Sequence, residues 1–423
     1  MTPSLSRQRF TWSTLLALLA ASLLTACFGR ATHDDAAASW YGTWSVAPQD
    51  YNEPFPTPLP PLVFSNQTIR QVLRTSAGGK EVRVRFSNVF GKAPLKIDGA
   101  SIARAQSGAS IAPASSTELK FNGQPSVSIP AGEELWSDPA ALAVEAETDL
   151  AVSLFLASDT PASTQHMFAL RDNYVAAGNA LATDTLSNPE TRTSYFFITG
   201  VDVRSSARAS VVVAFGDSIT DGVGSTPGSN RRWTDFLVRR LRAEGNIGTV
   251  SVLNAGISGG RILTDVMGPK GVDRFERDVL GQSGVSHVII LLGINDIGFA
   301  SFVPNQEVSV EQMTAGLQSM IDKAKARGVK VLVGTLLPYK GAAVAGTSYY
   351  QEAHEPKRQA FNAWIRENKT LDGVIDFADI MKNPADPLAI LPAYDSGDRL
   401  HPSDAGYEAM ARAIDLALIT SKP

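Results

Sequence analysis

The sequence predicts two folded parts, a β domain followed by an α/β domain built on a parallel sheet. Between residues 40 and about 203, short segments of alternating polar and apolar residues are separated by Gly, Pro, Asn and Asp, a pattern typical of strands joined by turns. After about residue 210, apolar runs alternate with helical patterns, which predicts parallel strands covered by helices. Hydrophobic residues make up 44% of the 423 residues, enough for a sizeable core and too many for a mainly disordered chain.

The clearest strand of the first part is Glu81–Phe86, where charged and apolar residues alternate with a period of two. Further short strands are predicted at Thr68–Arg74, Leu95–Ala103, Thr117–Phe121, Ser126–Ile129, Leu150–Leu156 and Tyr195–Thr199. Many short strands with tight turns favour a β-sandwich of the jelly-roll type. We therefore predict an accessory β-sandwich domain over residues 40–205.

The second part, residues 209–423, contains four apolar runs that are typical of strands buried on both faces. Ligands of such sheets bind at the carboxyl ends of the strands, so functional residues are expected there. The runs are Val211–Phe215, Val250–Leu253, His287–Leu292 and Val329–Leu336, and helices are predicted at Trp233–Glu244, Ser309–Arg327 and Pro356–Asn368.

Polar, sharply turning segments follow three successive strands of this part, at residues 216–220, 254–260 and 293–296. In the first segment, Ser218 would lie near a helix N-terminus, where backbone N–H groups favour negative charge such as a reaction oxyanion. Ser218 could equally be a helix cap, and Asn295 and Asp296 could form an Asx turn or a cap. The coincidence of three such segments indicates a site at this edge of the sheet.

A serine nucleophile needs a general base, usually histidine, and the chain has only five histidines. His401 lies just before the last predicted helix, and Asp398 precedes it by three residues, close enough to orient its ring. Local packing in a loop is the alternative for His401.

Four segments together resemble the sequence blocks of the SGNH (GDSL-type) hydrolases, in the same order. They are Gly216-Asp217-Ser218, Asn254 to Gly259, Gly293-Ile294-Asn295-Asp296, and Asp398-Arg399-Leu400-His401. The resemblance covers roughly residues 210–420 and implies a flavodoxin-like three-layer α/β/α fold and ester hydrolysis without metal or cofactor. It implies that Ser218 is the nucleophile, His401 the base and Asp398 its orienting group. The oxyanion hole would be the N–H groups of Ser218 and Gly259 with the Asn295 amide.

The first part contains the segments Thr68-Ile69-Arg70-Gln71, Val82 to Asn88 and Phe90-Gly91. With these segments it resembles the β domain of two-domain members of this family, among them bacterial carbohydrate esterases. This resemblance does not fix a substrate. We expect removal of a small acyl group, such as acetyl, from a carbohydrate, and the alternative is a lipase or lysophospholipase reaction on a lipid acyl chain. Five aromatic residues cluster in a Pro-rich segment and would either stack on a sugar or pack internally; they are Trp40, Tyr41, Trp44, Tyr51 and Phe55.

Three other interpretations fit parts of the same pattern. Residues 256–260 match the G-x-S-x-G elbow of α/β-hydrolases, which would make Ser258 the nucleophile. A metal-dependent phosphohydrolase would use oxygen and nitrogen ligands drawn from Asp217, Asp221, Asn295, Asp296 and His401. A glycan-binding protein with an inactive hydrolase domain is the third.

The first 26 residues have the features of a bacterial export signal. The apolar stretch Leu15–Leu24 is too short to span a bilayer, which takes about 20 helical residues. It ends in Leu24-Thr25-Ala26-Cys27, which resembles the lipobox of bacterial lipoproteins, where cleavage precedes a cysteine that is then lipidated. We expect a lipid anchor at Cys27 and a tether over residues 27–39; a plain secretory signal is the alternative.

Several classes are excluded by composition. Cys27 is the single cysteine, which excludes an intramolecular disulfide framework and Cys-cluster metal sites. The net charge is −4 without a basic run, so no nucleic-acid partner is expected.

The residue after Cys27 is Phe28. In this respect the sequence resembles Gram-negative lipoproteins that are sent to the outer membrane. The expected location is therefore the cell envelope.

Overall fold

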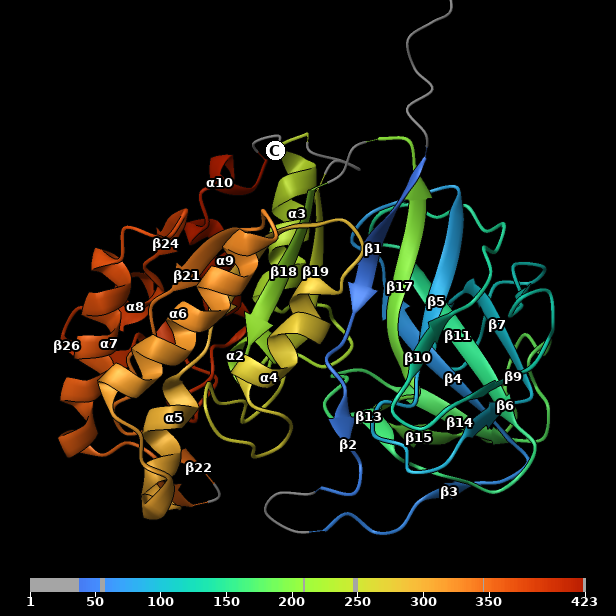
Figure 1. The fold of residues 1–423 in the computed structure, drawn as a ribbon, viewed down its shortest axis with the longest axis horizontal. Coiled ribbons are helices and arrows are strands. Elements are labelled where there is room, and N and C mark those ends of the chain that lie inside the picture. The colour runs from blue at the N-terminus through green and yellow to red at the C-terminus, as the bar shows by residue number, and fades with distance from the viewer. Residues whose placement is uncertain (1–37, 54–57, 208–209, 246–249, 345, 421–423) are drawn as a thin grey trace, which may run out of the picture. The chain divides into compact units, whose positions relative to one another are not determined.

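The computed structural model describes residues 38–53, 58–207, 210–245, 250–344 and 346–420 (Figure 1). The predicted signal segment and Cys27 lie outside these ranges. Ser39–Pro423 form one compact unit, in which a β half precedes an α/β half. The domain boundary at residues 205–209 stays a prediction. No helix of the described ranges combines the length and apolar character that a bilayer-spanning segment requires.

The α/β half is built on a parallel sheet of five strands in the order β19-β18-β20-β21-β24. Numbered along the chain this order is 2-1-3-4-5, the order of flavodoxin-like sheets. The strands are β18 (Ser210–Gly216), β19 (Val250–Gly256), β20 (Val285–Leu291), β21 (Lys330–Gly334) and β24 (Gly373–Ile375). The four predicted runs are thus confirmed as strands, and the short β24 was missed.

The helices that cover this sheet include the three expected ones, confirmed to within a residue or two. Ser309 begins one of them with a capping box, since its hydroxyl accepts from the N–H of Gln312 and the Gln312 side chain bonds back to the N–H of Ser309. The longer helices are α3 (Trp233–Ala243), α6 (Val310–Ala326), α7 (Glu355–Glu367) and α9 (Asp404–Ala413). Their apolar faces join the buried strands in one core.

The β half contains two larger antiparallel sheets whose inner side chains share one apolar core. The first sheet has the order β1 (Ser39–Ser45), β17 (Ile198–Ser205), β5 (Glu81–Ser87) and β10 (Glu134–Trp136). The second has the order β15 (Glu190–Arg192), β14 (Asn173–Ala177), β4 (Gln67–Arg74), β11 (Asp149–Leu156), β7 (Gly99–Arg104) and β8 (Thr117–Leu119).

Two of the predicted strands in this half are wrong as single elements. Residues 95–103 form β6 (Leu95–Ile97) and β7 in different sheets, separated at Asp98, whose carboxylate accepts from the N–H of Ala157 at 2.9 Å. Residues 195–199 form β16 (Tyr195–Phe196) and the start of β17. Phe197 interrupts them with a left-handed φ of 59°.

The two halves meet where β1 lies beside β19, an edge strand of the parallel sheet (Figure 1). Hydroxyl groups carry much of this contact. Ser251 donates to the carbonyl of Gly42 at 2.5 Å, and Ser45 donates to the carbonyl of Asn254 at 3.0 Å. Gly42 is required for the close approach, because a Cβ there would lie 2.7 Å from the Leu253 Cδ1. The β half therefore covers an edge that would otherwise expose unpaired backbone.

The described aromatic residues near the start of the β half pack internally. Trp44 meets Tyr195 edge to face with 5.0 Å between ring centroids, and the Arg83 guanidinium lies 4.7 Å from the Trp40 ring. Tyr51 packs on the β-half core. Phe55 lies outside the described ranges. These contacts favour packing over a sugar-stacking wall.

Candidate active site

A tight turn at the end of β18 presents Ser218. Asp217 caps the short helix α2 (Ser218–Asp221), accepting from the N–H of Ile219 at 3.0 Å. The backbone of α2 rests directly on the end of β19, because a Cβ on Gly256 would lie 2.3 Å from the amide nitrogen of Asp221. Glycine at position 256 is therefore what allows the helix to lie so close to the strand.

Ser218, His401 and Asp398 form a continuous hydrogen-bonded series. The Ser218 hydroxyl lies 2.8 Å from His401 Nε2, and His401 Nδ1 lies 2.5 Å from the Asp398 carboxylate. The other oxygen of Asp398 accepts from the N–H groups of Leu400 and His401, at 2.9 and 2.8 Å. This is the geometry of a nucleophile, its base and an orienting group.

Asp398 fixes the protonation pattern of this series. Burial opposes its ionisation, but the hydrogen bond and charge of His401 and the two backbone N–H groups outweigh burial and lower the pKa of Asp398 to about 2. The carboxylate therefore holds a proton on His401 Nδ1. Nε2 is then free to accept the proton of the Ser218 hydroxyl.

The expected oxyanion donors come from the ends of three neighbouring strands. Ser218 begins α2 after β18, Gly259 follows β19 with a left-handed φ of 73°, and Asn295 lies in α5 (Ile294–Gly298) after β20. The Asn295 amide donates to the carbonyl of Gly260 at 3.0 Å, which uses one of its two N–H bonds. The N–H of Ile257 donates to the carbonyl of Gly216 at 3.1 Å, joining the loop of Gly259 to the nucleophile turn.

Tyr349 orients the Asn295 amide. Its buried hydroxyl donates to Asn295 Oδ1 at 2.5 Å, which leaves the NH₂ group facing Gly260 and the strand ends. Burial raises the pKa of Tyr349 well above its usual value, so the hydroxyl remains a donor. Tyr349 directly follows the short strand β23 (Thr347–Ser348), and the sequence pattern gave it no role in orienting Asn295.

The other polar groups of the strand ends are bound elsewhere. Ser258 donates to the Asp221 carboxylate at 2.7 Å, so this serine faces a carboxylate while Ser218 faces an imidazole. Asp296 accepts from the N–H groups of Ile262 and Leu263, at 2.8 and 3.3 Å. Within the described ranges, no group of three or more His, Cys, Asp or Glu side chains is arranged to hold a metal ion.

Burial changes the ionisation of two carboxyl groups beside the nucleophile. It raises the pKa of Asp217 to about 7 and that of Asp296 to about 6, and each is fully enclosed. Asp217 Oδ2 has no hydrogen-bond partner in the described part of the chain. The negative charge of Asp217 is therefore poorly compensated at neutral pH.

Residues 214–409 match the model of the GDSL-like Lipase/Acylhydrolase family. An acetylxylan esterase from Geobacillus stearothermophilus is 27% identical over 220 residues, which cover 47% of this chain and 89% of that relative. The protein is a carboxylic ester hydrolase. Its matched segment contains Ser218, Asn295 and both members of the Asp398–His401 pair.

Solved structures with a similar fold each cover about half of this hydrolase. A GDSL-like lipase from Bacteroides thetaiotaomicron has 24% identity and a TM-score of 0.37, and covers 49% of this chain and 87% of its own. An acetyl xylan esterase from Geobacillus stearothermophilus has 23% identity and a TM-score of 0.39, and covers 51% of this chain and 96% of its own.

We expect Tyr349→Phe to lower the kcat of the hydrolase roughly tenfold with little change in KM, because the amide of Asn295 loses its fixed orientation. Steady-state rates on nitrophenyl acetate measure this. In an Asn295→Ala background the same substitution should have no further effect. Tyr350→Phe is the matched control, since the hydroxyl of that neighbour has no hydrogen-bond partner among the described residues. Equal losses of kcat in Tyr349→Phe and Tyr350→Phe would contradict the orienting role of Tyr349.

Asp217→Asn tests the buried carboxyl. A folded-state pKa raised from 3.8 to about 7 gives the wild-type hydrolase stability that is present at low pH and lost as the pH rises through 7. The amide keeps an oxygen for the Ile219 N–H and carries no charge. We expect the variant to be more stable than wild type at pH 8 by a few kcal/mol, since each pKa unit corresponds to about 1.4 kcal/mol.

Urea unfolding at pH 5 and pH 8 measures the difference, which should shrink at the lower pH. Asp379→Asn, on the exposed side of α8 (Phe377–Met381), removes a surface carboxylate and serves as the control substitution. A stability difference that is the same at both pH values would show that Asp217 titrates normally.

Proposed function

We propose that this hydrolase is a serine esterase that works through an acyl-enzyme, with Ser218 as nucleophile, His401 as general base and Asp398 as orienting group. The observation that carries the proposal is the 2.8 Å contact between the Ser218 hydroxyl and His401 Nε2, with Asp398 on the other ring nitrogen. Neither a bound metal nor a cofactor has a role in this scheme.

In the proposed reaction, Ser218 Oγ attacks the ester carbonyl while His401 takes its proton. The carbonyl oxygen becomes an oxyanion held by the N–H groups of Ser218 and Gly259 and by the Asn295 amide. His401 returns the proton to the leaving alcohol, and the acyl group remains on Ser218. Water then attacks the acyl carbonyl while His401 takes its proton. His401 returns this proton to Ser218 Oγ as the acyl bond breaks, which releases the carboxylic acid and free Ser218.

For the substrate we propose a small acyl ester, acetyl in particular, on a carbohydrate. The support is the match to an acetylxylan esterase, which covers 89% of that relative. A lipid or lysophospholipid acyl chain is the second candidate, because the matched family model includes lipases.

The β half is proposed to be an accessory β-sandwich domain of jelly-roll type over residues 40–205. Its support is the pair of antiparallel sheets with a shared core. We further propose export to the cell envelope, with removal of residues 1–26 and a lipid anchor at Cys27, on the strength of the lipobox-like sequence that ends there. An acyl-anchored enzyme would act on esters of the envelope or its surroundings.

The first test is a series of nitrophenyl esters from acetate to palmitate with protein that lacks residues 1–27. We expect the highest kcat/KM at two to four carbons, no effect of EDTA, and loss of turnover by at least about 10³-fold in Ser218→Ala. Ser258→Ala, the rival nucleophile, should retain turnover. Activity in Ser218→Ala would refute the assignment, and an optimum at eight or more carbons would move the substrate to lipid.

The anchor is tested on the full chain expressed in a bacterial host. We expect the mature protein to partition into detergent and to have the mass of a chain that begins at residue 27 and carries acyl groups. Cys27→Ser should remain uncleaved and unacylated. A mature N-terminus at any other residue, without acylation, would show a plain secretory signal instead.

A further inference from the structure

Asp221, the last residue of α2, is a buried carboxylate with partners on both of its oxygens. His166 Nε2 lies 3.1 Å from Oδ1. The hydroxyl and N–H of Ser258 donate to Oδ2, at 2.7 and 3.1 Å. All three residues are buried. Neither His166 nor Asp221 takes part in the bond-making steps proposed above.

His166 reaches this carboxylate from the β half. It ends strand β13 (Thr164–His166), and its Nδ1 lies 2.9 Å from the carbonyl oxygen of Ala47. Both ring nitrogens thus face acceptors, which requires a proton on each and makes the ring an imidazolium. Burial opposes this charge, but Asp221 and the two hydrogen bonds outweigh burial and raise the pKa of His166.

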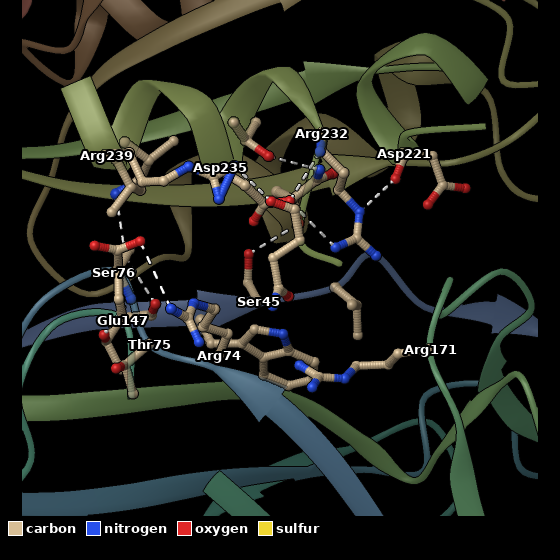
Figure 2. A pocket seen from close by; sticks show the side chains of 18 of the residues that line it. Ser45, Arg74, Thr75, Ser76, Glu147, Arg171, Asp221, Arg232, Asp235 and Arg239 are labelled. Atoms are coloured by element: carbon tan, nitrogen blue, oxygen red, sulfur yellow. Dashed lines mark hydrogen bonds and ion pairs between the residues drawn. The ribbon is translucent and has the colours of Figure 1, made fainter. Parts of the chain in front are cut away.

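Arg232 makes a second connection between the halves at the same place. Its Nε donates to the carbonyl of Asp221 at 2.7 Å, and its Nη2 donates to the carbonyl of Ala169 at 2.6 Å. Figure 2 shows Arg232 and Asp221 joined in this way at the wall of a pocket of about 60 Å³. His166 also lines this pocket, and the remaining charged groups of its lining are Arg74, Glu147, Arg171, Asp235 and Arg239.

The buried pair lies behind two of the proposed catalytic elements. Asp221 closes the helix that Ser218 opens, and Ser258 directly precedes Gly259. The Asp221 carboxylate therefore ties the nucleophile helix to the loop that carries an oxyanion donor. Movement of either element would break a hydrogen bond to a buried charge, which is costly.

The β half also holds the other side of the Gly259 loop. Gln49 of β2 (Gln49–Asp50) donates through its side-chain amide to the carbonyl of Met267, and its Oε1 accepts from the N–H of Met167 at 2.9 Å. The Met267 side chain packs on Gly259, because a Cβ there would lie 3.0 Å from the sulfur. Two β-half side chains thus restrain the surroundings of one oxyanion donor.

We infer that His166 is a positioning residue through which the β half completes the active site. By holding Asp221, it fixes the nucleophile helix and the Gly259 loop relative to each other. The inference rests on the proposed roles of Ser218 and Gly259. It makes the β half part of the catalytic apparatus, whether or not it also contacts a glycan.

The test compares His166→Leu, His166→Gln and Ser258→Ala on nitrophenyl acetate. His166→Leu should lower kcat about tenfold or more with KM within about twofold, because the acyl group still binds and the transition state is held less well. His166→Gln should recover part of the loss, since its amide can donate to Asp221. Ser258→Ala should lower kcat about threefold. The double variant His166→Leu/Ser258→Ala should lose less than the product of the single losses, because both act through Asp221.

His287 provides a matched control. It is a second buried histidine, bonded to Ser286 at the N-terminal end of β20, the end away from Asn295. His287→Leu should lower the thermal midpoint and leave kcat of the folded enzyme unchanged. Circular dichroism and the thermal midpoint are recorded for every variant.

Wild-type kcat in His166→Gln and Ser258→Ala would overturn the inference, as would a lower thermal midpoint with unchanged kcat in His166→Leu. If His166→Leu does not fold, Ser258→Ala and His166→Gln still decide the question. The Ser218→Ala variant distinguishes failure of the proposed function from failure of the positioning role. Turnover in Ser218→Ala would refute the proposed function, whereas an inactive Ser218→Ala together with fully active His166 variants would refute the positioning role alone.

Discussion

A parallel sheet ends all its strands at one edge and leaves an unpaired strand at each side, and the rest of this protein depends on both facts. The first brings together the segments that follow β18, β19 and β20. Because β18 and β20 flank the point where the strand order reverses, Ser218 and Asn295 are placed on either side of the crevice that such sheets offer to ligands. The second leaves the edge strand β19 to be covered by β1, and each strand contributes one serine hydroxyl that donates to a carbonyl of the other.

Three carboxylates crowd around the nucleophile turn, and an isolated buried charge is unstable in a protein interior. Each is stabilised in a different way. Asp296 accepts two backbone N–H groups, and Asp217 accepts one and has its pKa raised to about 7 by burial. Asp221 forms an ion pair with His166 at 3.1 Å, and that partner comes from the other half of the chain. The interface between the two halves therefore both covers the edge of the sheet and stabilises the turn that carries Ser218.

The sequence was sufficient for the longer apolar strands and for site residues that lie close together in the chain. Long apolar runs predicted β18 to β21, whereas β24 has three residues and left no periodic signal. Asp398 and His401 could be paired in advance because they lie three residues apart. The contacts that could not be predicted join distant residues, such as Gln49 with Met267 and Tyr349 with Asn295. The left-handed Phe197 was missed for another reason, since bulky residues rarely adopt that conformation.

The buried hydrogen bonds between the two halves indicate that they work as one enzyme. A binding module that only increased the local concentration of substrate would need no more than a flexible connection or a modest polar surface. Here the β half instead places His166 against the Asp221 carboxylate and the Gln49 amide against the carbonyl of Met267, at distances where small displacements break hydrogen bonds. Donors to a developing oxyanion contribute to the rate only when their positions are fixed before reaction. An interface that fixes them stabilises the fold and the transition state through the same contacts.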